Sequence, residues 1–148
     1  MLKRFDGKPV SGRLVYRRSE YSFDVEPQPE QGGASLLIND VQLEINEDGH
    51  LIYVWGLCPH ESWVPARLDP PPSKAGRLQY VNGTVIPGVS KRLNASERWP
   101  VSFDPSSGWL CIGSTSVQAE AVAFAPGAVA VLIEAEIAAL WLHPETQK

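Results

Sequence analysis

The chain has 148 residues, of which 43% are hydrophobic and 20% are charged, and its formal net charge is −4. This balance is typical of a folded globular protein and argues against a disordered chain. The length predicts a single domain over residues 1–148. The negative net charge argues against nucleic acid as a partner, because surfaces that bind nucleic acid are usually basic.

The beginning of the sequence carries charged residues and lacks the apolar run of a signal peptide. No uninterrupted apolar stretch reaches the length of about 20 residues that a membrane-spanning helix needs. We therefore expect a cytoplasmic protein with no membrane partner.

Short apolar segments bounded by turn residues predict strands in the first part of the chain. Residues 10–17 predict an edge strand whose charges discourage pairing with other chains. Residues 21–25 and 34–38 predict two further strands, and residues 26–33 between them predict a polar loop with proline and glycine.

A hairpin over residues 41–59 is the central element of the expected fold. Val41, Leu43 and Ile45 alternate with polar residues, a period of two that is typical of a half-buried strand. The pair Asp48-Gly49 favours a tight turn. The second arm, residues 51–55, is apolar on both faces and should lie inside a sheet or under a second layer, with Trp55 in the core.

The second half of the chain predicts more hairpins. Residues 59–75 are rich in proline and predict a rigid extended segment. Residues 77–81 and 84–86 should pair around Asn82-Gly83. Residues 101–112 should form a hairpin whose faces are filled by Trp109 and Cys111 on one side and by Leu110 and Ile112 on the other.

The region from residue 128 to residue 141 is ambiguous, because its alanines favour a helix while its valines and isoleucine alternate. We interpret it as strand–turn–strand, with a helix as the alternative. The expected fold class is therefore mainly β, with antiparallel hairpins forming a sandwich or a partly open barrel and a C-terminal region that is part helical in the alternative.

Catalytic and metal-binding patterns are weak. Cys58 and His60 lack a second pair of ligands at zinc spacing, so no metal and no cofactor is expected. The apolar neighbours of Cys58 would raise its pKa rather than activate it as a nucleophile. Cys58 and Cys111 are expected to be buried reduced thiols, with a disulfide as the alternative. We expect no enzyme, and an enzyme that uses Cys58 or a histidine is the third hypothesis.

Charge is most biased between residues 21 and 66, which contain no Lys or Arg. Carboxylates gathered on one side would speed the encounter with a basic protein, whereas a merely solvated face is the alternative. Affinity would need desolvated aromatic anchors, for which Tyr53, Trp55 and Trp63 are candidates. The expected partner-binding residues are Asp24, Glu26, Glu30, Glu44, Glu47, Asp48, Glu61 and Trp63.

Three tryptophan-containing segments resemble small bacterial immunity proteins of polymorphic toxin and contact-dependent growth inhibition systems. They are residues 54–59 followed by Trp63, residues 108–113 and residues 140–144, and the resemblance covers about residues 36–144. It implies a non-catalytic cytoplasmic protein that binds one cognate toxin, such as a basic nuclease domain, and blocks its active site.

The second hypothesis is a small β-barrel that binds a ligand or a carbohydrate through exposed tryptophans. A cavity lined by Trp55, Trp63 and Trp109 would favour this ligand-binding module. A filled core with an acidic convex surface would favour the toxin inhibitor.

Overall fold

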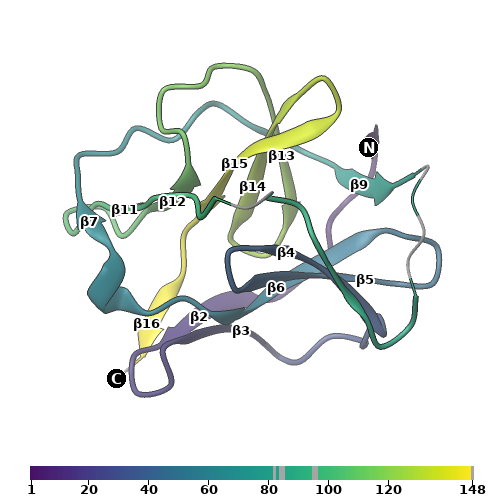
Figure 1. The fold of residues 1–148 in the computed structure, drawn as a ribbon, viewed down its shortest axis with the longest axis horizontal. Helices are drawn as coiled ribbons and strands as arrows, with labels where there is room; N and C mark the ends of the chain where they lie inside the picture. Colours follow the sequence, from purple (N-terminus) through teal and green to yellow (C-terminus); the bar gives the residue numbers. More distant parts are fainter. Residues whose placement is uncertain (82, 84–85, 95–96, 148) are drawn as a thin grey trace.

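Two seven-stranded sheets form a β-sandwich, as the computed structural model shows (Figure 1). The structure describes residues 1–81, 83, 86–94 and 97–147. The first sheet has the strand order β10 (Ser90–Arg92), β4 (Ala34–Ile38), β5 (Val41–Ile45), β6 (Leu51–Leu57), β3 (Ser22–Glu26), β2 (Arg13–Arg17) and β16 (Glu145–Gln147). The second has the order β7 (Val64–Pro65), β11 (Val101–Phe103), β12 (Leu110–Gly113), β15 (Glu136–Leu142), β14 (Ala128–Ile133), β13 (Glu120–Ala125) and β8 (Lys74–Ala75).

A separate ribbon of β1 (Leu2–Phe5) and β9 (Arg77–Tyr80) joins the two sheets at one side of the sandwich. Tyr80 N donates to Gly49 O in the β5–β6 turn of the first sheet at 2.8 Å, and Leu2 N donates to Ala135 O in the β14–β15 turn of the second sheet at 2.8 Å. A short 3₁₀ turn, η1 (His60–Ser62), follows β6.

The alternation of the central hairpin decides which side chains enter the core. Leu36, Leu43 and Val54 lie opposite one another on β4, β5 and β6, and all three are fully buried between the sheets. On the other face of the same strands, Glu44 lies opposite Tyr53 and Gln42 lies opposite Trp55. The predicted period of two is therefore confirmed for this hairpin, with Ile52 as an extra residue at an irregularity of the register.

The second sheet is covered on both faces. Leu110 and Ile112 enter the core between the sheets, whereas Cys111 and Trp141 form an outer cluster with Leu68. Leu68 belongs to the proline-rich segment, and its backbone N–H donates to the Asp104 carboxylate at 3.0 Å. The predicted two faces of this hairpin are confirmed, and the segment of residues 66–72 serves as a cover for the sheet.

The C-terminal region consists of strands, so the helical alternative is wrong. β14 and β15 pair in antiparallel fashion. Their connection is Glu134-Ala135, whose φ values of 52° and 65° are those of a tight hairpin turn. The mainly β prediction is confirmed, and the arrangement is a sandwich rather than a barrel.

The predicted edge position of residues 10–17 is wrong. β2 is not an edge strand, because β16 pairs with it in parallel and places Glu145 opposite Val15. β9 pairs with β1, and its predicted pairing with residues 84–86 stays a prediction. Residues 84 and 85 and the predicted turn residue Asn82 lie outside the described part of the chain.

The outermost strands of both sheets are short. β10 and β16, at the edges of the first sheet, contain three residues each, and β7 and β8, at the edges of the second, contain two each. In the described part of the chain no helix has the length and apolar character required to cross a membrane.

Candidate functional site

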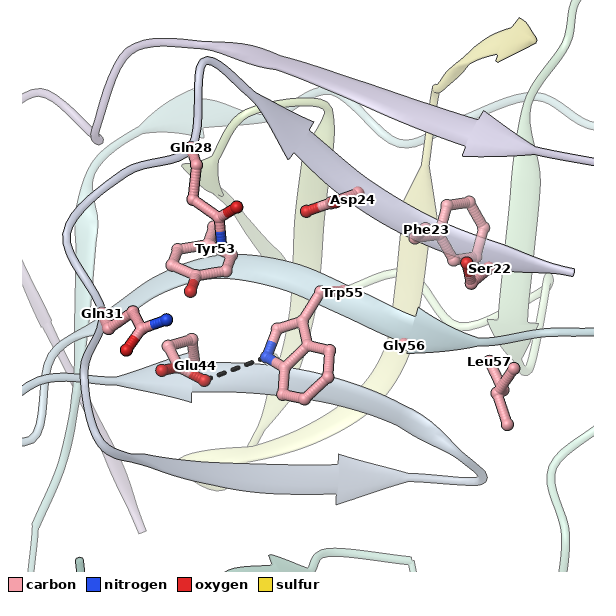
Figure 2. Close-up of a pocket in the computed structure, with 10 residues that line it drawn as sticks. All are labelled: Ser22, Phe23, Asp24, Gln28, Gln31, Glu44, Tyr53, Trp55, Gly56 and Leu57. Carbon is pink, nitrogen blue, oxygen red and sulfur yellow. Dashed lines mark hydrogen bonds between the residues drawn. The ribbon is translucent and has the colours of Figure 1, made fainter. Parts of the chain in front are cut away.

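A hollow of about 390 Å³ opens on the outer face of the first sheet, over β3, β5 and β6. Figure 2 shows the rings of Tyr53 and Trp55 on β6 between Glu44 on one side and Asp24 on the other. Gln28 and Gln31 come from the loop that follows β3. The lining residues are Ser22, Phe23, Asp24, Gln28, Gln31, Glu44, Tyr53, Trp55, Gly56 and Leu57.

Glu44 is the most deeply set acid of the hollow, with only 7% of its surface exposed. Its Oε2 accepts hydrogen bonds from the backbone N–H groups of Gly32 at 2.9 Å and Gly33 at 3.2 Å. Its Oε1 accepts a hydrogen bond from Trp55 Nε1 at 2.9 Å. All three donors are neutral, and no described Lys or Arg forms an ion pair with Glu44. Neutral donors therefore hold the carboxylate in place, and no described Lys or Arg side chain pairs with it.

Glycine is required where the loop approaches Glu44. A Cβ atom at Gly32 would collide with the backbone carbonyl of Ile45. The close approach of this loop to β5 brings the Gly32 N–H within reach of the carboxylate. The loop thereby forms one wall of the hollow and fixes its shape.

Asp24 lies on the opposite wall and belongs to a network of ion pairs. Its Oδ2 lies 2.8 Å from Arg17 Nη1, and Arg17 Nη2 lies 2.6 Å from Glu26. Glu26 in turn lies 3.1 Å from Arg13. Because Arg17 is shared between two carboxylates, it compensates the charge of Asp24 only in part.

The electrostatics of the hollow act on Tyr53, which is 4% exposed. Burial is the main cause that raises the pKa of its phenol, and the negative charges of Glu44 and Asp24 raise it further. A hydrogen bond with Gln28 acts in the opposite direction. Both carboxylates therefore disfavour a further negative charge at this position.

Trp55 is not in the core, and that prediction is wrong. It lies on the outer face opposite Gln42, is half-buried and packs only along the margin of the core. The loop of residues 27–33 lies over this face of the sheet (Figure 2), yet Trp55 keeps a contact with solvent that the neighbouring Tyr53 has lost. The apolar residues on both faces of β6 predicted that Trp55 is buried. The loop of residues 27–33 covers Tyr53 but leaves part of Trp55 exposed.

The other predicted contact residues are spread along the molecule. Asp24, Glu26 and Glu44 share the outer face of the first sheet. Glu30 is exposed on the loop beside the hollow, whereas Glu47 and Asp48 are exposed in the β5–β6 turn. Glu61 is exposed in η1 beside Tyr21, whose pKa it raises through a hydrogen bond. The structure therefore groups four of the acids on or beside the outer face of the first sheet and places the other three in the β5–β6 turn and in η1.

Trp63 belongs to a separate aromatic cluster. Its ring lies 4.7 Å from Tyr16 and 5.1 Å from Phe103, measured between centroids, and its Nε1 donates to Cys58 Sγ at 3.3 Å. Trp109 stacks on His143 at 4.5 Å between centroids. The tryptophans at positions 55, 63 and 109 therefore lie in three separate places. The single cavity lined by all three, which the ligand-binding hypothesis expected, is not formed by these residues.

Both cysteine thiols lie in buried surroundings that disfavour the thiolate form. Burial raises the pKa of Cys58 to about 11 and that of Cys111 to about 12. Tyr16 Oη donates to the Cys58 backbone oxygen at 2.7 Å and lies 3.3 Å from His60 Nδ1. The Tyr16 hydroxyl therefore connects the backbone of Cys58 with the His60 ring. Both cysteines are free thiols. Among the described residues, no three or more His, Cys, Asp or Glu side chains are placed to hold a metal ion.

Sequence reasoning missed Gln28, Gln31 and Arg17 as parts of the site. The glutamines lie in a loop with no periodic signal, and Arg17 is joined to the site through the pairing of β2 with β3. Comparisons of the chain with protein-family models, with curated proteins and with solved structures gave no match.

Proposed function

We propose that this is a non-catalytic, cytoplasmic binding protein that neutralises a cognate toxin domain by direct contact through the outer face of the first sheet. The observation that carries the proposal is the hollow itself. Two aromatic rings, Tyr53 and Trp55, stand beside two carboxylates, Asp24 and Glu44, on the outer face of the first sheet, where Trp55 remains only half-buried. Partly exposed aromatic residues with neighbouring charges are typical of the residues that dominate protein interfaces.

The acidic character of the surrounding span supports a basic partner. Residues 21–66 contain no Lys or Arg. The described ion pairs of this face draw their cations from Arg13 and Arg17 on β2. A negative potential there raises the rate of encounter with a cationic toxin domain such as a nuclease, and the aromatic rings supply affinity after contact.

The test is protection against a toxin. A toxin domain encoded beside this gene, at the end of a large secreted protein, should lose its toxicity when the two proteins are co-expressed, and they should purify as a complex. Trp55→Ala should weaken the complex. The matched control is Trp109→Ala, which removes a half-buried tryptophan from the second sheet. A toxin that stays active and unbound contradicts the proposal.

The second candidate is a carbohydrate-binding module that uses the same hollow. The observation in its favour is that amide and carboxyl groups of Gln28, Gln31 and Asp24 surround the rings of Tyr53 and Trp55 (Figure 2). Aromatic rings with a few polar groups are typical of small-ligand sites. Saturable binding of a glycan to the wild-type protein, lost in Trp55→Ala and kept in Trp109→Ala, would favour this candidate over the toxin inhibitor.

A further inference from the structure

The charge of the hollow is negative and only partly compensated. Of its ten lining residues, two are acids and none is Lys, Arg or His. Glu44 receives hydrogen bonds only from neutral N–H groups, although a carboxylate so deeply buried is ordinarily paired with a cation. Arg17 pairs with Asp24 on the wall of the hollow, but it also donates a hydrogen bond to Glu26. The hollow is thus prepared for a positive group from outside the chain.

The aromatic wall favours a flat cation. The hydrogen bond from Trp55 Nε1 to Glu44 fixes the indole beside the carboxylate, so that a group stacked on the ring also lies near negative charge. A guanidinium is planar, stacks on aromatic faces and donates several hydrogen bonds to carboxylates at once. An ammonium has the charge without the flat shape. A neutral sugar would add no positive charge beside either carboxylate.

We propose that the hollow bounded by Asp24, Glu44 and Trp55 receives an arginine side chain of a protein partner. The guanidinium stacks on the indole and donates hydrogen bonds to the two carboxylates. This inference rests on the proposed function and specifies the partner chemistry at that site. The loop of residues 27–33 positions Gln28 and Gln31 to close around the aliphatic stem of the incoming side chain (Figure 2).

The experiment uses the full chain labelled with ¹⁵N and three probes: Nα-acetylarginine amide, the lysine equivalent and the neutral citrulline equivalent. The arginine probe should give saturable shifts at the Trp55 indole N–H and at the Gly32 and Gly33 amides. Citrulline, which has nearly the same shape without the charge, should bind at least tenfold more weakly, and lysine should lie between them. Equal binding of arginine and citrulline, or no shift with arginine, overturns the inference.

A pair of variants connects the shifts to the site. Asp24→Asn keeps an oxygen acceptor for Arg17 but removes one negative charge, and it should weaken arginine binding several-fold. Glu47→Gln, in the exposed β5–β6 turn outside the hollow, should leave binding unchanged. Equal effects of the two variants would mean that only the total charge matters, which overturns the site. If Asp24→Asn does not fold, the comparison of arginine with citrulline on the wild-type protein decides.

The outcomes separate this inference from the proposed function. Protection against the toxin together with no arginine binding in the hollow refutes the inference and leaves the toxin inhibitor standing. Arginine binding without any effect on the toxin refutes the inhibitor. Shifts of the same residues with methyl glycosides but not with arginine replace both by the carbohydrate-binding module.

Discussion

The indole of Trp55 donates a hydrogen bond of 2.9 Å to Glu44, which lies on β5 two residues from Gln42, the residue directly opposite Trp55. The bond joins a half-buried tryptophan and a buried acid on the outer face of the first sheet. It also couples β6 to the loop of residues 27–33, because the same carboxylate accepts from Gly32 and Gly33. The side chain of Glu44 therefore links β5, β6 and the loop of residues 27–33.

Replacement of Glu44 by alanine should loosen this loop. The N–H groups of Gly32 and Gly33 and the Trp55 indole would lose their acceptor, and we expect the free energy of unfolding to fall by about 1–3 kcal/mol. Urea denaturation measures the loss, and amide exchange should speed up at Gly32 and Gly33. Glu47→Ala, at an exposed turn, should change stability by less than about 0.5 kcal/mol. Unchanged exchange at both glycines would contradict the role given to Glu44.

Trp55 and Trp141, which lie on the outer faces of the two sheets, should differ in their contribution to stability. Trp141 is 2% exposed beneath the proline-rich segment, so Trp141→Ala should cost about 3–5 kcal/mol, the usual range for a buried aromatic residue. Trp55→Ala should cost less, because part of that indole remains in solvent. Chemical denaturation of both variants checks the order. An equal or larger loss for Trp55→Ala would place its ring in the core after all.

Alkaline pH should destabilise the fold through its buried thiols. The folded pKa of Cys58 is raised to about 11 from an ordinary 9.0, so the folded state keeps its proton after the unfolded chain has lost it. The stabilisation that this raised pKa contributes is fully present below about pH 9. As the pH rises toward 11, the free energy of unfolding falls by up to about 1.4 kcal/mol per pH unit for each such group. Cys111, with a pKa of about 12, adds to the effect in the same direction.

Denaturation curves between pH 8 and pH 11 measure this slope, and Cys58→Ala should reduce it. Cys58→Ser also removes the titrating thiol while keeping a side chain of similar size, and it should reduce the slope in the same way. Rapid alkylation of Cys58 in the native protein at pH 8 would be the opposite of the expected result, since the thiol is 4% exposed.

The parts of the fold that could be predicted are those with local causes. The alternation of Val41, Leu43 and Ile45 depends on neighbouring residues alone, and their burial follows from it. The opposite faces of Cys111 and Ile112 follow in the same way. By contrast, β16 is a short polar segment without a pattern, and its pairing with β2 joins residues far apart in the sequence. The interior position of β2 could not be read from residues 10–17.

The site could be predicted only in part, for the same reason. The period of two places Glu44 on the outer face, but its burial comes from Gly32 and Gly33 across a loop. Asp24 joins Glu44 in one hollow because β3 pairs with β6, where Phe23 lies opposite Gly56. The acidic span shows where acids are concentrated along the sequence. It could not show which carboxylates share a surface.

The brevity of the outermost strands limits how another polypeptide can attach. A foreign segment that extends a sheet needs a long row of free amide and carbonyl groups, and β7, β8, β10 and β16 offer two or three residues each. Recognition is thereby directed to side chains on the faces of the sandwich. The same property should keep concentrated solutions of the protein free of fibrils that grow by edge-to-edge stacking.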